Sequence, residues 1–113
     1  HYFVRSFEDD AFSTAIKNSK SIIDADPDKY LKFCSESDSD GFLSDIMSAI
    51  CDNEYRFIFY HKSDYWAIKG KKEQEIFANL FSLESLNDKS KLDFLKKAFP
   101  DLFEAYLKLE FFI

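Results

Sequence analysis

The sequence of 113 residues is poor in the two residue types that most often interrupt regular structure. It contains two glycines and two prolines, which leaves little room for long irregular loops. Its apolar share of 46% is too high for a disordered acidic chain. We therefore expect one ordered globular domain over residues 1–113, a common size for a domain.

Other missing features exclude whole classes of protein. No run of about 18 apolar residues occurs, so we expect no membrane span. The first residues, His1 to Ser6, lack the basic region and apolar core of a secretory signal peptide. Cys34 and Cys51 are the only cysteines and lack a metal-site spacing. They are expected to be two buried thiols in a reducing cytoplasm.

Catalytic motifs are missing as well. The sequence contains no G-x-S-x-G, no P-loop, no glycine pattern for a dinucleotide and no H-E-x-x-H. His61 is the only internal histidine, and Ser63 and Asp64 share one turn with it, which does not make a catalytic triad. The sequence therefore predicts no enzyme, with no catalytic residues, no metal and no cofactor.

Aromatic residues and helical periodicity are abundant. Fourteen Phe, six Tyr and one Trp supply large side chains for a core. Apolar residues recur at helical spacing, and helix starts are marked by Asp26-Pro27, by Asn87 or Asp88, and by Pro100-Asp101. These signals predict helices over about 11–25, 27–35 and 42–51, after Gly70, after residue 88 and from residue 100 onward.

Two other aromatic and β-branched runs indicate strands. Arg56–His61 and Tyr65–Lys69 flank the polar turn Lys62–Asp64, which predicts a β-hairpin. Tyr2–Phe7 is a further candidate strand. The expected fold class is α+β, a mostly helical domain with a short antiparallel β-hairpin or a three-stranded sheet.

Charge is divided unevenly along the chain. Residues 6–54 contain twelve acidic residues and four lysines, whereas residues 65–113 contain eight of each. An acidic surface favours a basic partner and speeds association with it. Local lysine pairs such as Lys96-Lys97 lie in a chain of net charge −6, so nucleic acid is not the expected partner.

The segment Glu36–Met47 resembles the calcium loop of an EF-hand. Asp38 and Asp40 fall on the third and fifth positions of that loop, and Gly41 falls on its turn glycine. Glu36 stands where Asp is the rule, and Met47 stands where a bidentate Glu closes the calcium shell. The alternative to a degenerate EF-hand is an acidic start to the next helix.

The order of segments resembles ribonuclease-toxin immunity proteins of bacterial contact-dependent inhibition and related polymorphic toxin systems. The residues that carry the resemblance are Gly41-Phe42 at a helix start, the Cys-and-acid segment Cys51–Tyr55, the aromatic hairpin and the aromatic helical C-terminus. It implies a cytoplasmic inhibitor that binds one basic toxin domain as a monomer, one to one. The alternative hypothesis also depends on an acidic surface: the chain would be a nucleic-acid mimic of phage type that blocks a host nuclease.

The resemblance and the charge together give a set of candidate partner-binding residues. Carboxylates would meet the basic cleft of a nuclease toxin, and Tyr and Trp are common anchors of interfaces. The candidates are Glu36, Asp38, Asp40, Asp45, Asp52 and Glu54 for charge, and Tyr55, Tyr60 and Trp66 for anchoring.

Overall fold

The computed structural model describes residues 10–38, 40–57 and 63–110. Within these ranges every regular element is helical. The helices are α2 (Asp10–Ala25), α3 (Pro27–Ser37), α4 (Phe42–Cys51), α5 (Ser63–Trp66), α6 (Lys71–Ser85), α7 (Lys89–Ala98) and α8 (Pro100–Glu110).

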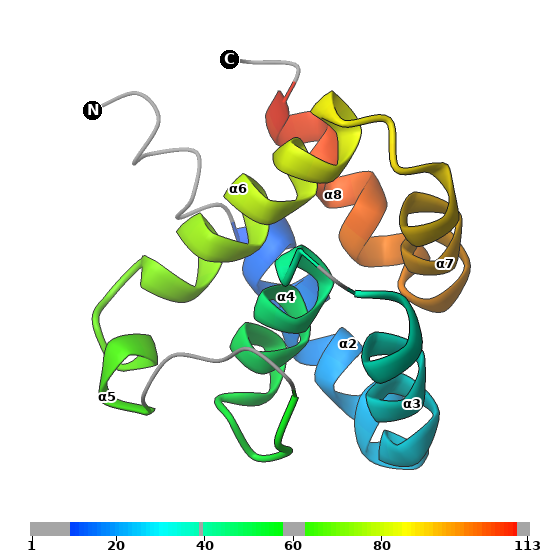
Figure 1. Ribbon diagram of the computed structural model, residues 1–113. Coiled ribbons are helices and arrows are strands. Elements are labelled where there is room, and N and C mark those ends of the chain that lie inside the picture. The colour runs from blue at the N-terminus through cyan, green and yellow to red at the C-terminus, as the bar shows by residue number, and fades with distance from the viewer. Residues whose placement is uncertain (1–9, 39, 58–62, 111–113) are drawn as a thin grey trace.

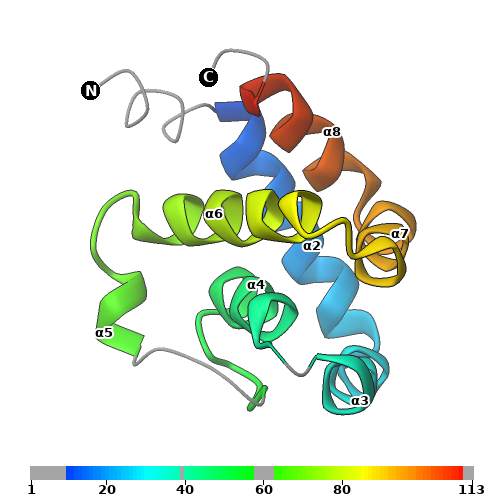
Figure 2. The same cartoon turned by 45° about the horizontal axis from the view of Figure 1, so that its top comes forward.

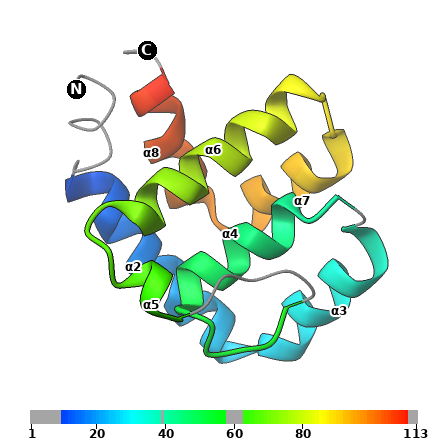
Figure 3. The same ribbon diagram turned by 60° about the vertical axis from the view of Figure 1, so that its left-hand side comes forward.

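Helix α4 lies at the centre of the fold (Figures 1 and 3). All of its residues except Phe42 and Asp45 are buried. A helix that is apolar on nearly all sides is typical of a core position. Helix α6 packs against α4, and α2 packs against both α4 and α8.

The first and last described helices lie side by side at the edge of the fold. Figure 2 shows α2 next to α8, with the first turn of α2 and the last turn of α8 at the same end of the molecule. The two helices are therefore antiparallel. Helix α7 connects α6 to α8 and contacts both of them.

The predicted helix starts are confirmed where capping signals were strong. Helix α4 has the predicted bounds, α3 and α8 begin at their prolines, and Asp88 accepts a hydrogen bond from the backbone N–H of Lys91 as the N-cap of α7. Helix α6 ends in a Schellman motif, because the N–H of Asp88 bonds to the carbonyl of Leu83 and Asn87 has a φ of 54°. Asn adopts this left-handed conformation more readily than most residues.

The predicted α+β class is wrong, because no strand occurs among the described residues. Tyr65 and Trp66 belong to the single helical turn α5, and residues 67–70 form a turn before α6. The second strand of the predicted hairpin is thus absent. Most of the first strand, residues 58–61, and the candidate strand at residues 2–7 lie outside the described residues.

The predicted second strand is absent because the aromatic residues of this region are buried in the core. Trp66 is 5% exposed and Phe57 is 3% exposed, and both belong to the hydrophobic core. The indole Nε1–H of Trp66 donates to Oδ1 of Asn53 at 2.9 Å, which fixes α5 to the end of α4. Aromatic β-propensity mainly reflects packing on a half-buried surface, and here the helical core supplies that packing.

The core is one connected cluster to which α2, α3, α4, α6, α7 and α8 all contribute. Tyr106, Phe12 and Phe99 are the largest side chains that are fully buried. Among the described helices, none combines the length and the apolar character needed to cross a bilayer.

Candidate functional site

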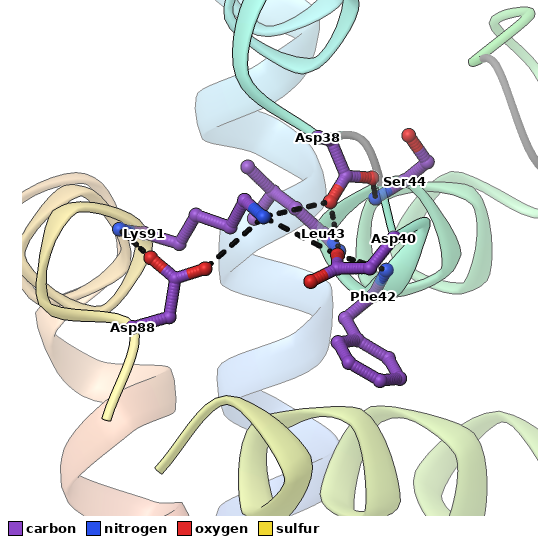
Figure 4. Close-up of polar contacts among 7 residues, drawn as sticks. All are labelled: Asp38, Asp40, Phe42, Leu43, Ser44, Asp88 and Lys91. Carbon is purple, nitrogen blue, oxygen red and sulfur yellow. Dashed lines mark hydrogen bonds and ion pairs between the residues drawn. The ribbon is translucent and has the colours of Figure 1, made fainter. Parts of the chain in front are cut away.

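The buried lysine Lys91 contacts carboxylates of the acidic half of the chain. The ammonium Nζ of Lys91 on α7 lies 3.2 Å from Oδ1 of Asp40, 3.1 Å from Oδ2 of Asp88 and 3.7 Å from Oδ1 of Asp38 (Figure 4). The Lys91 side chain is 6% exposed, and the Asp38 side chain is fully buried. We call these four residues the Lys91 cluster.

Asp38 also caps the central helix. Its Oδ1 accepts from the N–H of Leu43 at 3.1 Å, and its Oδ2 accepts from the N–H of Ser44 at 2.7 Å. Asp40 accepts from the N–H of Phe42 at 3.3 Å. Three of the free N–H groups at the start of α4 are thus paired with carboxylates, which also suit the positive end of the helix dipole.

The protonation of the cluster follows from these contacts. Burial opposes ionisation of Asp40, but the hydrogen bonds from Lys91 and from the N–H of Phe42 outweigh it and lower the pKa of Asp40. Burial likewise opposes the charge on Lys91, but the hydrogen bonds to Asp88 and Asp40 outweigh it and raise the pKa of Lys91. At neutral pH Lys91 is therefore protonated and Asp40 is ionised.

The contacts of Asp38 and Asp40 are relevant to the resemblance of Glu36–Met47 to a calcium loop. The carboxylates that would be the third and fifth calcium ligands, Asp38 and Asp40, are directed at Lys91 and at backbone N–H groups (Figure 4). Within the described part of the chain, no group of three or more His, Cys, Asp or Glu is arranged to hold a metal ion. The acidic segment therefore serves as a helix cap in this structure.

A second acidic group lies where α2 ends and α3 begins. Lys20 on α2 pairs with Asp24 at 2.8 Å and with Glu54 at 2.9 Å, and the hydroxyl of Tyr55 donates to Asp24 at 2.7 Å. These contacts bring the loop after α4 onto the last turns of α2. Nearby, Asp52 pairs with Lys72 of α6 at 2.7 Å.

Hydrogen bonding sets the protonation of this second group. Hydrogen bonds from Lys20 and Tyr55 lower the pKa of Asp24. Hydrogen bonds to Asp24 and Glu54 raise the pKa of Lys20, and the hydrogen bond to Asp24 raises the pKa of Tyr55. Asp24 is therefore ionised and Lys20 is charged at neutral pH.

Two further carboxylates extend this group without a counter-charge. Asp26 and Asp28 flank Pro27 at the start of α3, and both are exposed. Neither forms an ion pair with any other residue that the structure describes. We call the whole set the acidic corner, and its members are Asp24, Asp26, Asp28, Asp52 and Glu54.

The structure separates the predicted partner-binding residues into exposed and internal ones. Asp52 and Glu54 have side chains that are 55% and 51% exposed, Glu36 is exposed, and Tyr55 is half-buried. Asp38 and Trp66 are buried. Asp40 is turned toward Lys91, and Asp45 is half-buried in the first turn of α4. Tyr60 lies outside the described residues.

Sequence reasoning missed several residues of these sites. Asp24, Asp26 and Asp28 contribute to the acidic charge of residues 6–54, but the sequence predicts none of them as a binding residue. Lys91 gave no signal, because its carboxylate partner Asp40 is 51 residues away in the sequence. An internal cation for Asp38 and Asp40 could be inferred only once the helices are packed.

The two cysteines lie in the core. Cys34 is 0% exposed and Cys51 is 1% exposed. Burial raises the pKa of each thiol to about 12, and nearby carboxylates (Asp38 for Cys34, Asp24 for Cys51) add to the shift. Thiols with such pKa values are protonated at neutral pH and are poor nucleophiles.

Comparison of the chain with family models, with curated proteins and with solved structures found no match.

Proposed function

We propose that this chain is a non-enzymatic immunity protein that binds and neutralises a cognate basic toxin, a nuclease, through the acidic corner. The observation that carries the proposal is the exposure of Asp26 and Asp28, which have no ion-pair partner among the described residues. Such carboxylates are free to meet a cation on another protein without first breaking an internal pair.

Asp52 and Glu54 support the same surface. Each is more than half exposed although it pairs with one lysine. Surface ion pairs of this kind contribute little stability, at most about 1 kcal/mol, so a basic partner can compete for them. Tyr55 lies beside them and offers an amphipathic ring of the kind that anchors interfaces.

The mechanism follows from the chemistry of the partner. A nuclease binds phosphate, and its cleft is therefore lined with Lys and Arg. In the proposed complex the carboxylates of the corner occupy the positions of phosphates and block access to the catalytic groups. One copy of this chain would cover one toxin domain in the cytoplasm.

The experiment is a co-purification with the product of the neighbouring gene, followed by calorimetry and a nuclease assay. Calorimetry is done at about 0.1 M and about 1 M salt, between which the Debye length falls from about 10 Å to about 3 Å. We expect a one-to-one complex that weakens strongly with salt and has no nuclease activity. Failure to bind the neighbour, with inhibition of an unrelated host nuclease, would favour the nucleic-acid mimic instead.

A further inference from the structure

Helix α3 lies at the edge of the fold and is buried along one face (Figures 1 and 3). Of its eleven residues only Tyr30 and Cys34 are buried, while Leu31 and Phe33 are partly buried against the core. The central helix α4 is one residue shorter and buries eight residues. A segment with few buried apolar contacts is the kind that opens locally, without unfolding of the whole protein.

The chain leaves helical geometry at both ends of α3. Asp26, with a φ of −157° and a ψ of 70°, separates α3 from α2, and Pro27 has no N–H that could continue the hydrogen bonds of α2. At the other end, Gly41 has a left-handed φ of 88° just before α4 begins. An isolated helix of this length is marginal in water. We therefore expect the backbone hydrogen bonds of α3 to open when the helix leaves the core.

The place where α3 meets α4 and α7 contains a buried ion pair. The carboxylate of Asp38, at the end of α3, is fully buried 3.7 Å from the ammonium of Lys91, which is 6% exposed. The desolvation cost of such a pair can exceed the attraction between its charges. Contact with water would restore the hydration of both groups. The pair therefore resists opening less than an apolar contact of similar size would.

A second buried polar group at this place has no partner. The hydroxyl of Ser44, in the first turn of α4, is fully buried and forms no hydrogen bond with any described residue. The backbone N–H of Ser44 bonds to Asp38 (Figure 4). The polar group of α3 that the hydroxyl faces is the thiol of Cys34, which is a weak hydrogen-bonding group. An unpaired buried hydroxyl costs free energy that contact with water would recover.

We propose that α3 opens as a separate unit, hinged at Asp26 and Gly41, and that the Lys91 cluster holds it closed. The opening brings water to the buried ion pair and to the hydroxyl of Ser44. The packing of α4 on α6 and of α2 on α8 is kept, so the rest of the core stays folded.

The opening concerns the acidic corner, because α3 carries part of it. Asp26 lies at the hinge and Asp28 lies in the first turn of α3, whereas Asp24 belongs to α2 and Glu54 follows α4. A displacement of α3 changes the distances between these carboxylates, so the Lys91 cluster keeps the corner in one arrangement. The opening itself does not rest on the proposed function and is tested on the chain alone.

The test is native-state hydrogen exchange of the full chain, followed by NMR at increasing urea below the unfolding transition. We expect the amides of Leu31, Phe33 and Cys34 to exchange at least about tenfold faster than those of Ile46 and Ile50 in α4. Their exchange should depend little on urea, because a local opening exposes little surface. Exchange of both helices with one rate and one urea dependence would overturn the proposal.

Two serine variants test the weakness of this contact. Ser44→Ala removes the unpaired hydroxyl and should slow the exchange of α3 about fivefold or more, the low end of the cost of an unpaired buried group. Ser48→Ala is the matched control in the same helix, because Ser48 is equally buried but has an interaction partner, and it should not slow the exchange. Unchanged or faster exchange in Ser44→Ala would contradict the role of this hydroxyl.

Two further variants separate local opening from global unfolding. Ile76→Val, in the part of α6 that follows α5, removes a buried methyl group and should speed the exchange of α4 several-fold, while α3 exchanges as before. Lys91→Met should speed the exchange of α3 at least about a hundredfold, the size of a broken buried pair. An equal effect of Ile76→Val on both helices would show that α3 is not a separate unit. Unchanged α3 exchange in Lys91→Met would show that the Lys91 cluster does not hold α3 closed.

Discussion

The ammonium of Lys91 lies 3.2 Å from Oδ1 of Asp40, across 51 residues of sequence. The same ammonium lies beside Asp38, whose carboxylate caps the central helix α4. The contact thus joins the start of α4 to the start of α7. It also shows that part of the acidity of the N-terminal half is neutralised inside the protein.

Replacement of this lysine should be strongly destabilising. Lys91→Met removes the cation that lies beside the buried carboxylate of Asp38, and breaking one side of a buried pair costs about 3 kcal/mol or more. Urea denaturation measures the loss. Lys89→Met is the control, because Lys89 is 84% exposed and exposed changes usually alter stability by about 0.5 kcal/mol or less. Equal stabilities of the two variants would show that the cluster is not coupled to folding.

Stability should fall at acidic pH in a way that depends on Asp40. The pKa values of Asp40 and Asp24 are lower in the folded protein than their ordinary values. Their contribution is therefore present above the unfolded pKa of about 3.9 and is lost as pH falls through the lower folded pKa. Asp40→Asn should be less stable at neutral pH and should lose less stability on acidification.

The measurement is urea unfolding at neutral pH and at successive values below about pH 4, the range in which unfolded Asp becomes protonated. Asp93→Asn, at an exposed site of α7, serves as the comparison. If Asp40→Asn and the unchanged protein lose stability in parallel on acidification, the ion pair of Asp40 does not contribute.

Trp66 should behave as a core residue. It is the only tryptophan, it is 5% exposed, and its Nε1–H is bonded to Asn53. We expect blue-shifted emission and weak quenching by iodide. Asn53→Ala should cost about 1–3 kcal/mol, because it removes the acceptor of a buried donor, and should shift the emission to the red. Strong quenching of the unchanged protein would show instead that Trp66 is a surface anchor.

The cysteines should be unreactive until the protein unfolds. A pKa of about 12 for Cys34 and for Cys51 lowers the thiolate fraction near pH 8 by roughly three orders of magnitude relative to a free thiol of pKa about 8.5. Titration with a thiol reagent should therefore be slow for the folded protein and fast in denaturant. Rapid reaction of one cysteine without denaturant would contradict its burial.

Local signals predicted the helices well but not the whole fold. Asp26-Pro27, Asp88 and Pro100 mark helix starts with groups that act within one turn, so these ends were predictable. The hairpin prediction failed because the aromatic residues Tyr65 and Trp66 gain their burial from the core and from Asn53. A run of residues cannot show whether aromatic side chains pack in a sheet or on helices.

The candidate site could be predicted only in part. The excess of acid between residues 6 and 54 was visible in the sequence. Which acids are neutralised depends on Lys91, Lys72 and Lys20, which are distant in sequence from their carboxylate partners Asp40, Asp52 and Glu54. The exposed acids Asp26 and Asp28 therefore became candidates only once the helices were placed.

The most direct test of the central claim is the affinity of the double variant Asp26→Lys/Asp28→Lys for the neighbouring toxin, by calorimetry at about 0.1 M salt, where charge is only partly screened. We predict a loss of at least about tenfold, as expected for reversed charges at an electrostatic interface, that shrinks at high salt. Asp93→Lys should bind as the unchanged protein does. Undiminished binding and neutralisation by the double variant, with its fold intact by circular dichroism, would contradict the proposal that the acidic corner binds the toxin.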